Sequence, residues 1–282
     1  MSTPTPRPSY AAVLRVPHAR RTFAAALVGR LSYGTVGLAL MLSVTRATGS
    51  YAVAGTVMAL FGATSVFLSP YRAGLVDRHG PRRALLPMAL LYAALLCLLA
   101  AACGYPGTPP AVLAVTAAVT GACTPPLGST MRAVWAGLLP DRRMLQRAYS
   151  LDGVAEELLF VSGPLLVGVV VAVAPPAAGV LLSALLVAVG TLAFATSPAA
   201  GVLRTAGGGK EDAGRAGAGH GRALLQPVVV TAGVGVAVSA VDLLVVAFAG
   251  QRGLGGDTVA WVLAALSGLR FSPTPGYQGA AS

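Results

Sequence analysis

Long apolar stretches, each close to 20 residues, recur along this chain and leave little choice of fold. A helix needs roughly 20 predominantly apolar residues to cross the hydrocarbon core of a bilayer. Of the 282 residues, 55% are hydrophobic and 10% are charged, whereas about 25% are charged in a typical soluble domain. We therefore expect an all-α membrane protein. The predicted spans are residues 22–45, 52–71, 84–103, 110–131, 154–174, 177–196 and 223–249.

Basic residues are concentrated in alternate loops between these spans. The chain has 20 Lys and Arg against 9 Asp and Glu, a formal net charge of +11. Most of the basic residues lie in segment 1–21, near residues 78 and 140, and between 204 and 222, whereas the loops at 104–110 and 175–179 have none. Lys and Arg accumulate in cytoplasmic loops of membrane proteins. We therefore expect a multi-pass protein of the plasma membrane whose N-terminal segment, 1–21, is cytoplasmic, and no nucleic-acid partner.

The densest charge cluster lies between the second and third predicted spans. Residues 74–83 read Gly-Leu-Val-Asp-Arg-His-Gly-Pro-Arg-Arg, and their glycines and proline predict a tight turn. The segment resembles the signature loop between the second and third helices of major facilitator superfamily transporters. The resemblance implies that its charged residues latch the outward-facing state by pairing with neighbouring helix ends. The alternative is that its arginines only set the topology. The residues that match are Gly74, Asp77, Arg78, Gly80, Arg82 and Arg83.

The same resemblance implies two six-helix halves, each built from inverted three-helix repeats. Residues 22–196 are expected to form a complete N-terminal six-helix bundle, and the Gly- and Ala-rich residues 197–222 a flexible cytoplasmic linker. Residues 223–269 begin the C-terminal half, and 270–282 form a polar tail. We therefore expect seven to eight transmembrane helices in a chain truncated within its second half, with self-association as one route to a working unit.

Ionisable side chains at membrane depth are costly and are functional candidates by default. Asp242 lies among apolar residues of the seventh span. It either binds substrate, a cation or a proton, or hydrogen-bonds a neighbouring helix for packing. Arg30 is roughly 12 Å into the first span at 1.5 Å per residue. It either faces a central cavity or extends its long side chain to the cytoplasmic interface.

Three acidic residues, Asp152, Glu156 and Glu157, are expected at the cytoplasmic start of the fifth span. Negative charge at a helix N-terminus is favoured by the helix dipole, and residues four apart, such as Asp152 and Glu156, share a helix face. Proton coupling through Glu156 or Glu157 is the alternative to this structural role. The basic residues expected to pair with the three are Arg142, Arg143 and Arg147.

The fourth span contains two adjacent prolines. Pro125 and Pro126 are expected to break or kink it, because proline lacks a backbone N–H and its ring clashes with the preceding turn. Arg132, at the cytoplasmic end of this span, either pairs with Asp77 as part of the gate or adds one more topology charge.

The fifth span carries Gly163, Pro164 and Gly168. This pattern partially resembles the Gly-Pro motif on the fifth helix of drug-efflux antiporters of the same superfamily. The resemblance implies that these residues shape helix packing and keep the cavity closed to leak.

These features predict transport of a small molecule by alternating access, as proton-coupled export. The expected partners are the lipid bilayer and a small-molecule substrate, and no cofactor is expected beyond the proton. No catalytic constellation, metal-ligand spacing or phosphate-binding Walker loop occurs in the sequence, so we expect neither an enzyme nor a metal site. The alternative from another class is a truncated, non-transporting membrane fragment that acts only as an interaction partner.

Overall fold

A computed structural model of the chain describes residues 10–201 together with 240, 244–245, 247–248 and 251–252. Throughout these residues the regular elements are helices, which confirms the all-α fold. Asp242, the polar tail and nearly all of the predicted linker and seventh span lie outside the described residues.

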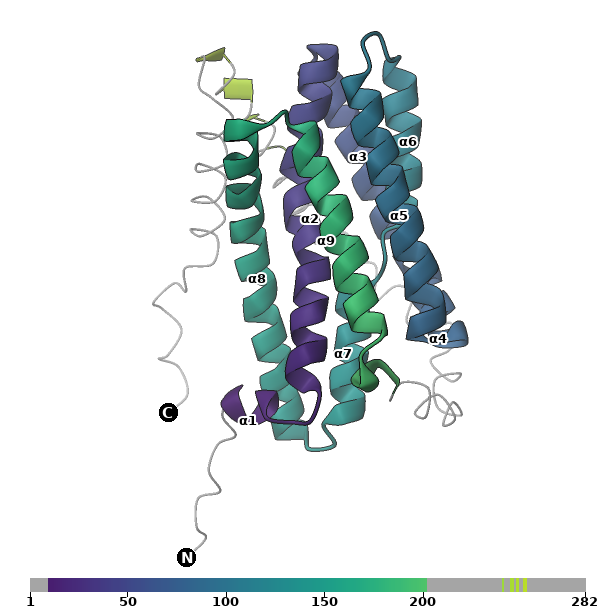
Figure 1. Ribbon diagram of the computed structural model, residues 1–282, viewed down its shortest axis with the longest axis vertical. Coiled ribbons are helices and arrows are strands. Elements are labelled where there is room, and N and C mark those ends of the chain that lie inside the picture. Colours follow the sequence, from purple (N-terminus) through teal and green to yellow (C-terminus); the bar gives the residue numbers. More distant parts are fainter. Residues whose placement is uncertain (1–9, 202–239, 241–243, 246, 249–250, 253–282) are drawn as a thin grey trace, which may run out of the picture.

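The helices run up and down in one bundle (Figure 1). Within the described residues, five segments are long and apolar enough to cross a membrane, and six if the bent pair α3 and α4 counts as one span. Each of the six N-terminal spans predicted from the sequence thus has a helical counterpart. The elements are α1 (Tyr10–Leu14), α2 (Ala19–Thr48), α3 (Tyr51–Phe67), α4 (Ser69–His79), α5 (Pro81–Gly104), α6 (Pro110–Ala122), α7 (Leu127–Leu138), α8 (Arg142–Val173), α9 (Ala177–Ala195) and the 3-10 helix η1 (Pro198–Gly201).

Helix α2 lies between α8 and α9 and contacts both closely (Figure 1). Glycine makes these contacts possible. A Cβ atom on Gly190 of α9 would lie 2.1 Å from the backbone nitrogen of Gly29, and one on Gly163 of α8 would lie 2.3 Å from the carbonyl carbon of Gly34. Small residues let membrane helices approach closely enough for van der Waals packing, which holds them together in lipid. The two contacts fix α2 as the central helix.

Two apolar cores lie one above the other in the orientation of Figure 1. On α2, the lower core takes side chains between Ala19 and Ala26, and the upper core takes side chains between Val36 and Val44. Between these two stretches α2 carries Arg30, Ser32 and Thr35, all buried. The bundle therefore has a polar layer between its two cores.

The fifth span begins earlier than predicted. We expected it over 154–174, but α8 begins at Arg142. The Asp141 carboxylate caps the helix by accepting hydrogen bonds from two backbone N–H groups of the first turn, both at 3.3 Å. Hydropathy locates only the apolar part of a helix, and this one continues into polar sequence. Asp152 and Glu156 consequently lie well inside α8 rather than at its N-terminus.

The charged segment 74–83 is not the loop that the sequence predicts. It is helical as far as His79, and α5 begins at Pro81, so Gly80 alone joins the two helices. Gly80 has a φ of 82°, a conformation that glycine adopts without steric cost. Gly74 lies inside α4, and no positive φ is found there.

We predict that Gly163→Ala separates α2 from α8. The new methyl group would meet the backbone of Gly34, which cannot rotate away as a side chain can. Overpacking of this kind costs about 1–3 kcal/mol, so the purified variant should unfold at a lower temperature in detergent.

Gly153→Ala is the matched control on the same helix, because a Cβ atom at Gly153 would have no neighbour within 4 Å. This substitution should leave the unfolding temperature unchanged or raise it, since alanine is the better helix former. Equal effects of the two substitutions would contradict the glycine contact.

Candidate functional site

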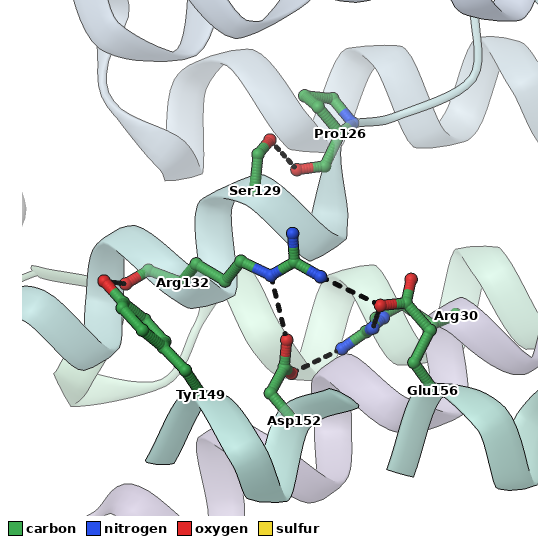
Figure 2. Close-up of polar contacts among 7 residues, drawn as sticks. All are labelled: Arg30, Pro126, Ser129, Arg132, Tyr149, Asp152 and Glu156. Carbon is green, nitrogen blue, oxygen red and sulfur yellow. Dashed lines mark hydrogen bonds and ion pairs between the residues drawn. The ribbon is translucent and has the colours of Figure 1, made fainter. Parts of the chain in front are cut away.

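Two arginines and two carboxylates from three helices meet in the polar layer (Figure 2). Arg30 of α2 places Nη1 2.6 Å from Oδ1 of Asp152 and Nη2 2.9 Å from Oε2 of Glu156. Arg132 of α7 places Nε 3.2 Å from Oδ2 of Asp152 and Nη2 2.9 Å from Oε2 of Glu156. Each arginine therefore bridges both carboxylates of α8, and we call these four residues the charge ring.

The charge ring is buried at one end and open at the other. The Arg30 and Asp152 side chains are 2% and 0% exposed, whereas those of Glu156 and Arg132 are 33% and 53% exposed. A buried ion pair contributes little when it is complete, but loss of one partner leaves an uncompensated charge in a medium of low dielectric constant. With two positive and two negative charges, the four side chains compensate one another.

Local sequence places these four side chains together. Asp152 and Glu156 are four residues apart on α8 and so project from one face. Gly128, in the first turn of α7, lies against the Arg30 guanidinium, since a Cβ atom there would be 3.8 Å from Nε. Arg132 follows one turn later on the same helix and reaches the carboxylates from the other side (Figure 2).

Arg30 does not extend to the cytoplasmic interface, because its side chain is buried and its head lies between the two carboxylates. Arg132 is not paired with Asp77 as the gate hypothesis supposes, since its described ion pairs are with Asp152 and Glu156. Arg132 pairs with these two carboxylates because it lies on α7 and faces α8.

The partners expected for the acidic residues also differ. We expected three arginines near the start of the fifth span, but Arg30 and Arg132 take this role for Asp152 and Glu156. The cause is the early start of α8, which puts the carboxylates about one and a half to four turns beyond those arginines. Glu157 belongs to no ion pair within the described part of the chain, and its buried Oε2 accepts no hydrogen bond there.

The signature residues flank the junction of α4 and α5, which lies at the lower end of the bundle in Figure 1. Asp77 and Arg78 end α4, and Arg82 and Arg83 open α5, all four exposed. Across the described residues, no ion pair joins any of the four to another side chain. Their role as a latch stays a prediction.

The fourth span is interrupted where Pro125 and Pro126 lie, between the end of α6 and the start of α7. The Tyr33 hydroxyl of α2 donates a hydrogen bond to the Pro125 carbonyl oxygen. Pro164 lies in α8, which is one uninterrupted helix, and Gly168 is buried on it.

Arg72 is the residue of this layer whose position the sequence does not reveal. In the sequence, Arg72 is only one more basic residue near the signature segment. In the structure it lies on α4, is 7% exposed, and its side chain reaches the interruption of the fourth span. Two adjacent prolines are the sequence signal that could have found it, because they leave carbonyl groups in need of a donor.

Comparison with known families gives one match. A family model described as Major Facilitator Superfamily matches residues 22–275, which is most of the chain. A search of curated proteins finds none that matches.

We predict that Asp152→Asn destabilises the protein by about 3–5 kcal/mol, the cost of breaking a buried ion pair from one side. The amide cannot compensate the charge of Arg30, which has almost no access to solvent. The free energy of unfolding can be measured by titrating SDS into the detergent-solubilised protein.

Glu157→Gln is the control, because this neighbouring carboxyl group lies outside the charge ring. A double variant, Arg30→Gln with Asp152→Asn, should be less destabilised than the sum of the two single variants. Additive effects would show that the two side chains are not energetically coupled.

Proposed function

The chain belongs to the major facilitator superfamily, and from this membership we propose that it exports a small molecule in exchange for protons. The family makes it a multi-pass membrane protein that carries a small molecule across a bilayer. Proton coupling, outward direction, location in the plasma membrane and a cytoplasmic N-terminus are the parts that we propose.

The charge ring is the observation that carries proton coupling. A proton bound to Glu156 would leave Arg30 and Arg132 sharing one carboxylate, and the two guanidinium groups would then repel each other in a medium of low dielectric constant. Glu156 is the acidic member of the ring with access to solvent, since Asp152 is fully buried. Glu156 is therefore the proposed proton acceptor.

The graded burial of the ring suggests how protonation changes the structure. Arg132 is the most exposed member and lies on α7, whereas Arg30 and Asp152 join α2 to α8 in the interior. Weakening the contacts of Arg132 would release α7 from α8 and leave the deeper pair in place. A proton at Glu156 would in this way favour one of the two states of an alternating-access cycle.

The proposed direction rests on the Gly163-Pro164 pattern, which resembles the fifth-helix motif of drug-efflux antiporters. Gly163 lies against Gly34, so it holds α8 tightly to α2 about two turns beyond Glu156 on the same helix. Close packing at this point is consistent with a motif that prevents leak along the transport path. Lipophilic cations are the substrate class that we propose to test first.

We predict that Glu156→Gln abolishes proton-driven transport but not downhill flux. The amide keeps the shape of the side chain and cannot take up a proton. Ethidium uptake into everted membrane vesicles with an acid interior should require the wild-type carboxylate and should fall by about tenfold or more in the variant. Ethidium flux down its own gradient, measured with a protonophore present, should persist.

Glu157→Gln is the matched control and should keep proton-driven uptake, since Glu157 lies next in sequence but outside the ring. Proton-driven uptake by Glu156→Gln would contradict the assignment. Loss of uptake in Glu157→Gln alone would identify Glu157 as the proton acceptor in place of Glu156. Asp242→Asn belongs in the same series, because Asp242 stays a prediction of the sequence.

We further predict that Asp77→Asn combined with Arg83→Ala lowers transport without lowering the unfolding temperature. Both side chains are exposed, so their loss costs the described bundle no buried contact. If these residues only set topology, the double variant should transport ethidium as well as the wild type once inserted in the same orientation.

A further inference from the structure

Pro125 and Pro126 leave two carbonyl oxygens of α6 without their usual partners. In a continuous helix the N–H of residue 125 would bond to the oxygen of Gly121, and that of residue 126 to the oxygen of Ala122. Proline has no N–H to donate. The Gly121 oxygen accepts other hydrogen bonds from the backbone N–H and the hydroxyl of Thr124, at 3.2 and 2.9 Å. Among the described residues no such local donor reaches the Ala122 oxygen. An unsatisfied carbonyl group inside a bilayer costs several kcal/mol, so the Ala122 oxygen requires another donor.

Arg72 of α4 supplies donors to the same two oxygens. Its Nη1 lies 2.7 Å from the Gly121 oxygen and 3.0 Å from the Ala122 oxygen. Its Nη2 donates to the carbonyl oxygen of Ser65, in the last turn of α3. That oxygen lies where the second span bends by 43° between α3 and α4. One guanidinium group thus binds the ends of two interrupted spans.

Arg72 belongs to no ion pair among the residues that the structure describes, although it is 7% exposed. The carbonyl ends of α3 and α6 compensate its charge instead. Each helix C-terminus carries about half a negative charge, so two such ends together match one cation.

The upper halves of these two spans are rigidly joined. A Cβ atom on Gly121 would lie 2.2 Å from the carbonyl oxygen of Phe61, so the backbones of α6 and α3 are in contact just above Arg72. Below Arg72, the second span bends by 43° into α4, and the fourth span breaks between Ala122 and Leu127 before α7 begins. The two interruptions therefore lie side by side at the level of the polar layer.

We propose that Arg72 is a positioning residue of the transport cycle, on which the lower halves α4 and α7 pivot against the fixed ends of α3 and α6. Arg72 keeps the freed carbonyl groups satisfied in every position of α7, so motion at the break exposes no unpaired backbone to lipid. The proposal rests on the proposed transport function, because α7 carries Arg132 of the charge ring.

Three variants separate this role from a purely structural cap. Arg72→Met should lower the unfolding temperature by about 5 °C or more, since the Ala122 and Ser65 oxygens lose their side-chain donor while the Gly121 oxygen keeps Thr124. Pro125→Ala with Pro126→Ala restores the two N–H groups and allows one continuous helix. This double variant should be less stable than the wild type, because a continuous helix removes the carbonyl end of α6 that compensates the buried Arg72 charge. Its maximal rate of downhill ethidium flux should fall about tenfold.

The combination of Arg72→Met with both proline substitutions is the decisive variant. Its stability should rise above that of the Arg72→Met variant and of the double proline variant, because backbone N–H groups replace the guanidinium at Gly121 and Ala122 and no buried cation remains. Its transport should stay low because the pivot is gone. If transport recovers together with stability, Arg72 serves only to satisfy the carbonyl groups, and the proposed pivot is wrong. Failure to recover stability would show that Arg72 does not replace the missing N–H groups.

Downhill flux needs no proton coupling, so this test remains valid if the coupling assigned to Glu156 is wrong. A wild-type protein that carries no ethidium would count against the proposed substrate class. The unfolding temperatures of the four proteins would still confirm or overturn the substitution of Arg72 for the proline N–H groups.

Discussion

Polar groups inside this bundle must be satisfied by the chain itself, because the hydrocarbon core of a bilayer offers no hydrogen bonds. The polar layer meets most of this requirement in two ways, although the Ser32 hydroxyl and Nε of Arg72 have no hydrogen-bond partner within the described residues. Arg30, Asp152, Glu156 and Arg132 compensate one another as charges, and Arg72 binds backbone carbonyl groups that helix breaks have freed. Both arrangements bring together residues far apart in sequence, so the layer exists only in the assembled bundle.

The two apolar cores and the glycine contacts provide the rigid frame around this layer. Gly34 and Gly163 bring backbone against backbone, as do Gly29 and Gly190, so α2 cannot slide against α8 or α9 without steric clash. Polar contacts respond differently, since a proton can remove one charge from the ring while the frame stays packed. The polar layer is for this reason the part of the bundle that chemistry can change.

The sequence predicts the helices well and their partners poorly. Apolar runs show where a chain is inside the membrane, and all six N-terminal spans have their helices. The apolar runs do not show where a helix begins or ends, because a polar extension of a helix contains no apolar run. The start of α8 at Arg142, capped by Asp141, could therefore not be predicted from them. Nor do they show which arginine meets Asp152, since Arg30 is 122 residues away and Arg142 is ten. Helix packing decides that choice, and no single span encodes it.

Helix α7 is the element on which the two polar arrangements converge. It has 12 residues, about 18 Å at 1.5 Å per residue, and is too short to cross the bilayer alone. The upper end of α7 follows the break at which Arg72 donates hydrogen bonds. Near the middle of α7, Arg132 forms an ion pair with Asp152 of α8. Helix α6, its partner in the same span, is instead joined to α3 through the backbone at Gly121. Under the proposed coupling, a proton that weakens the contacts of Arg132 would act on the half of the span that lacks this backbone contact, and Pro125 and Pro126 would set the level at which that half turns.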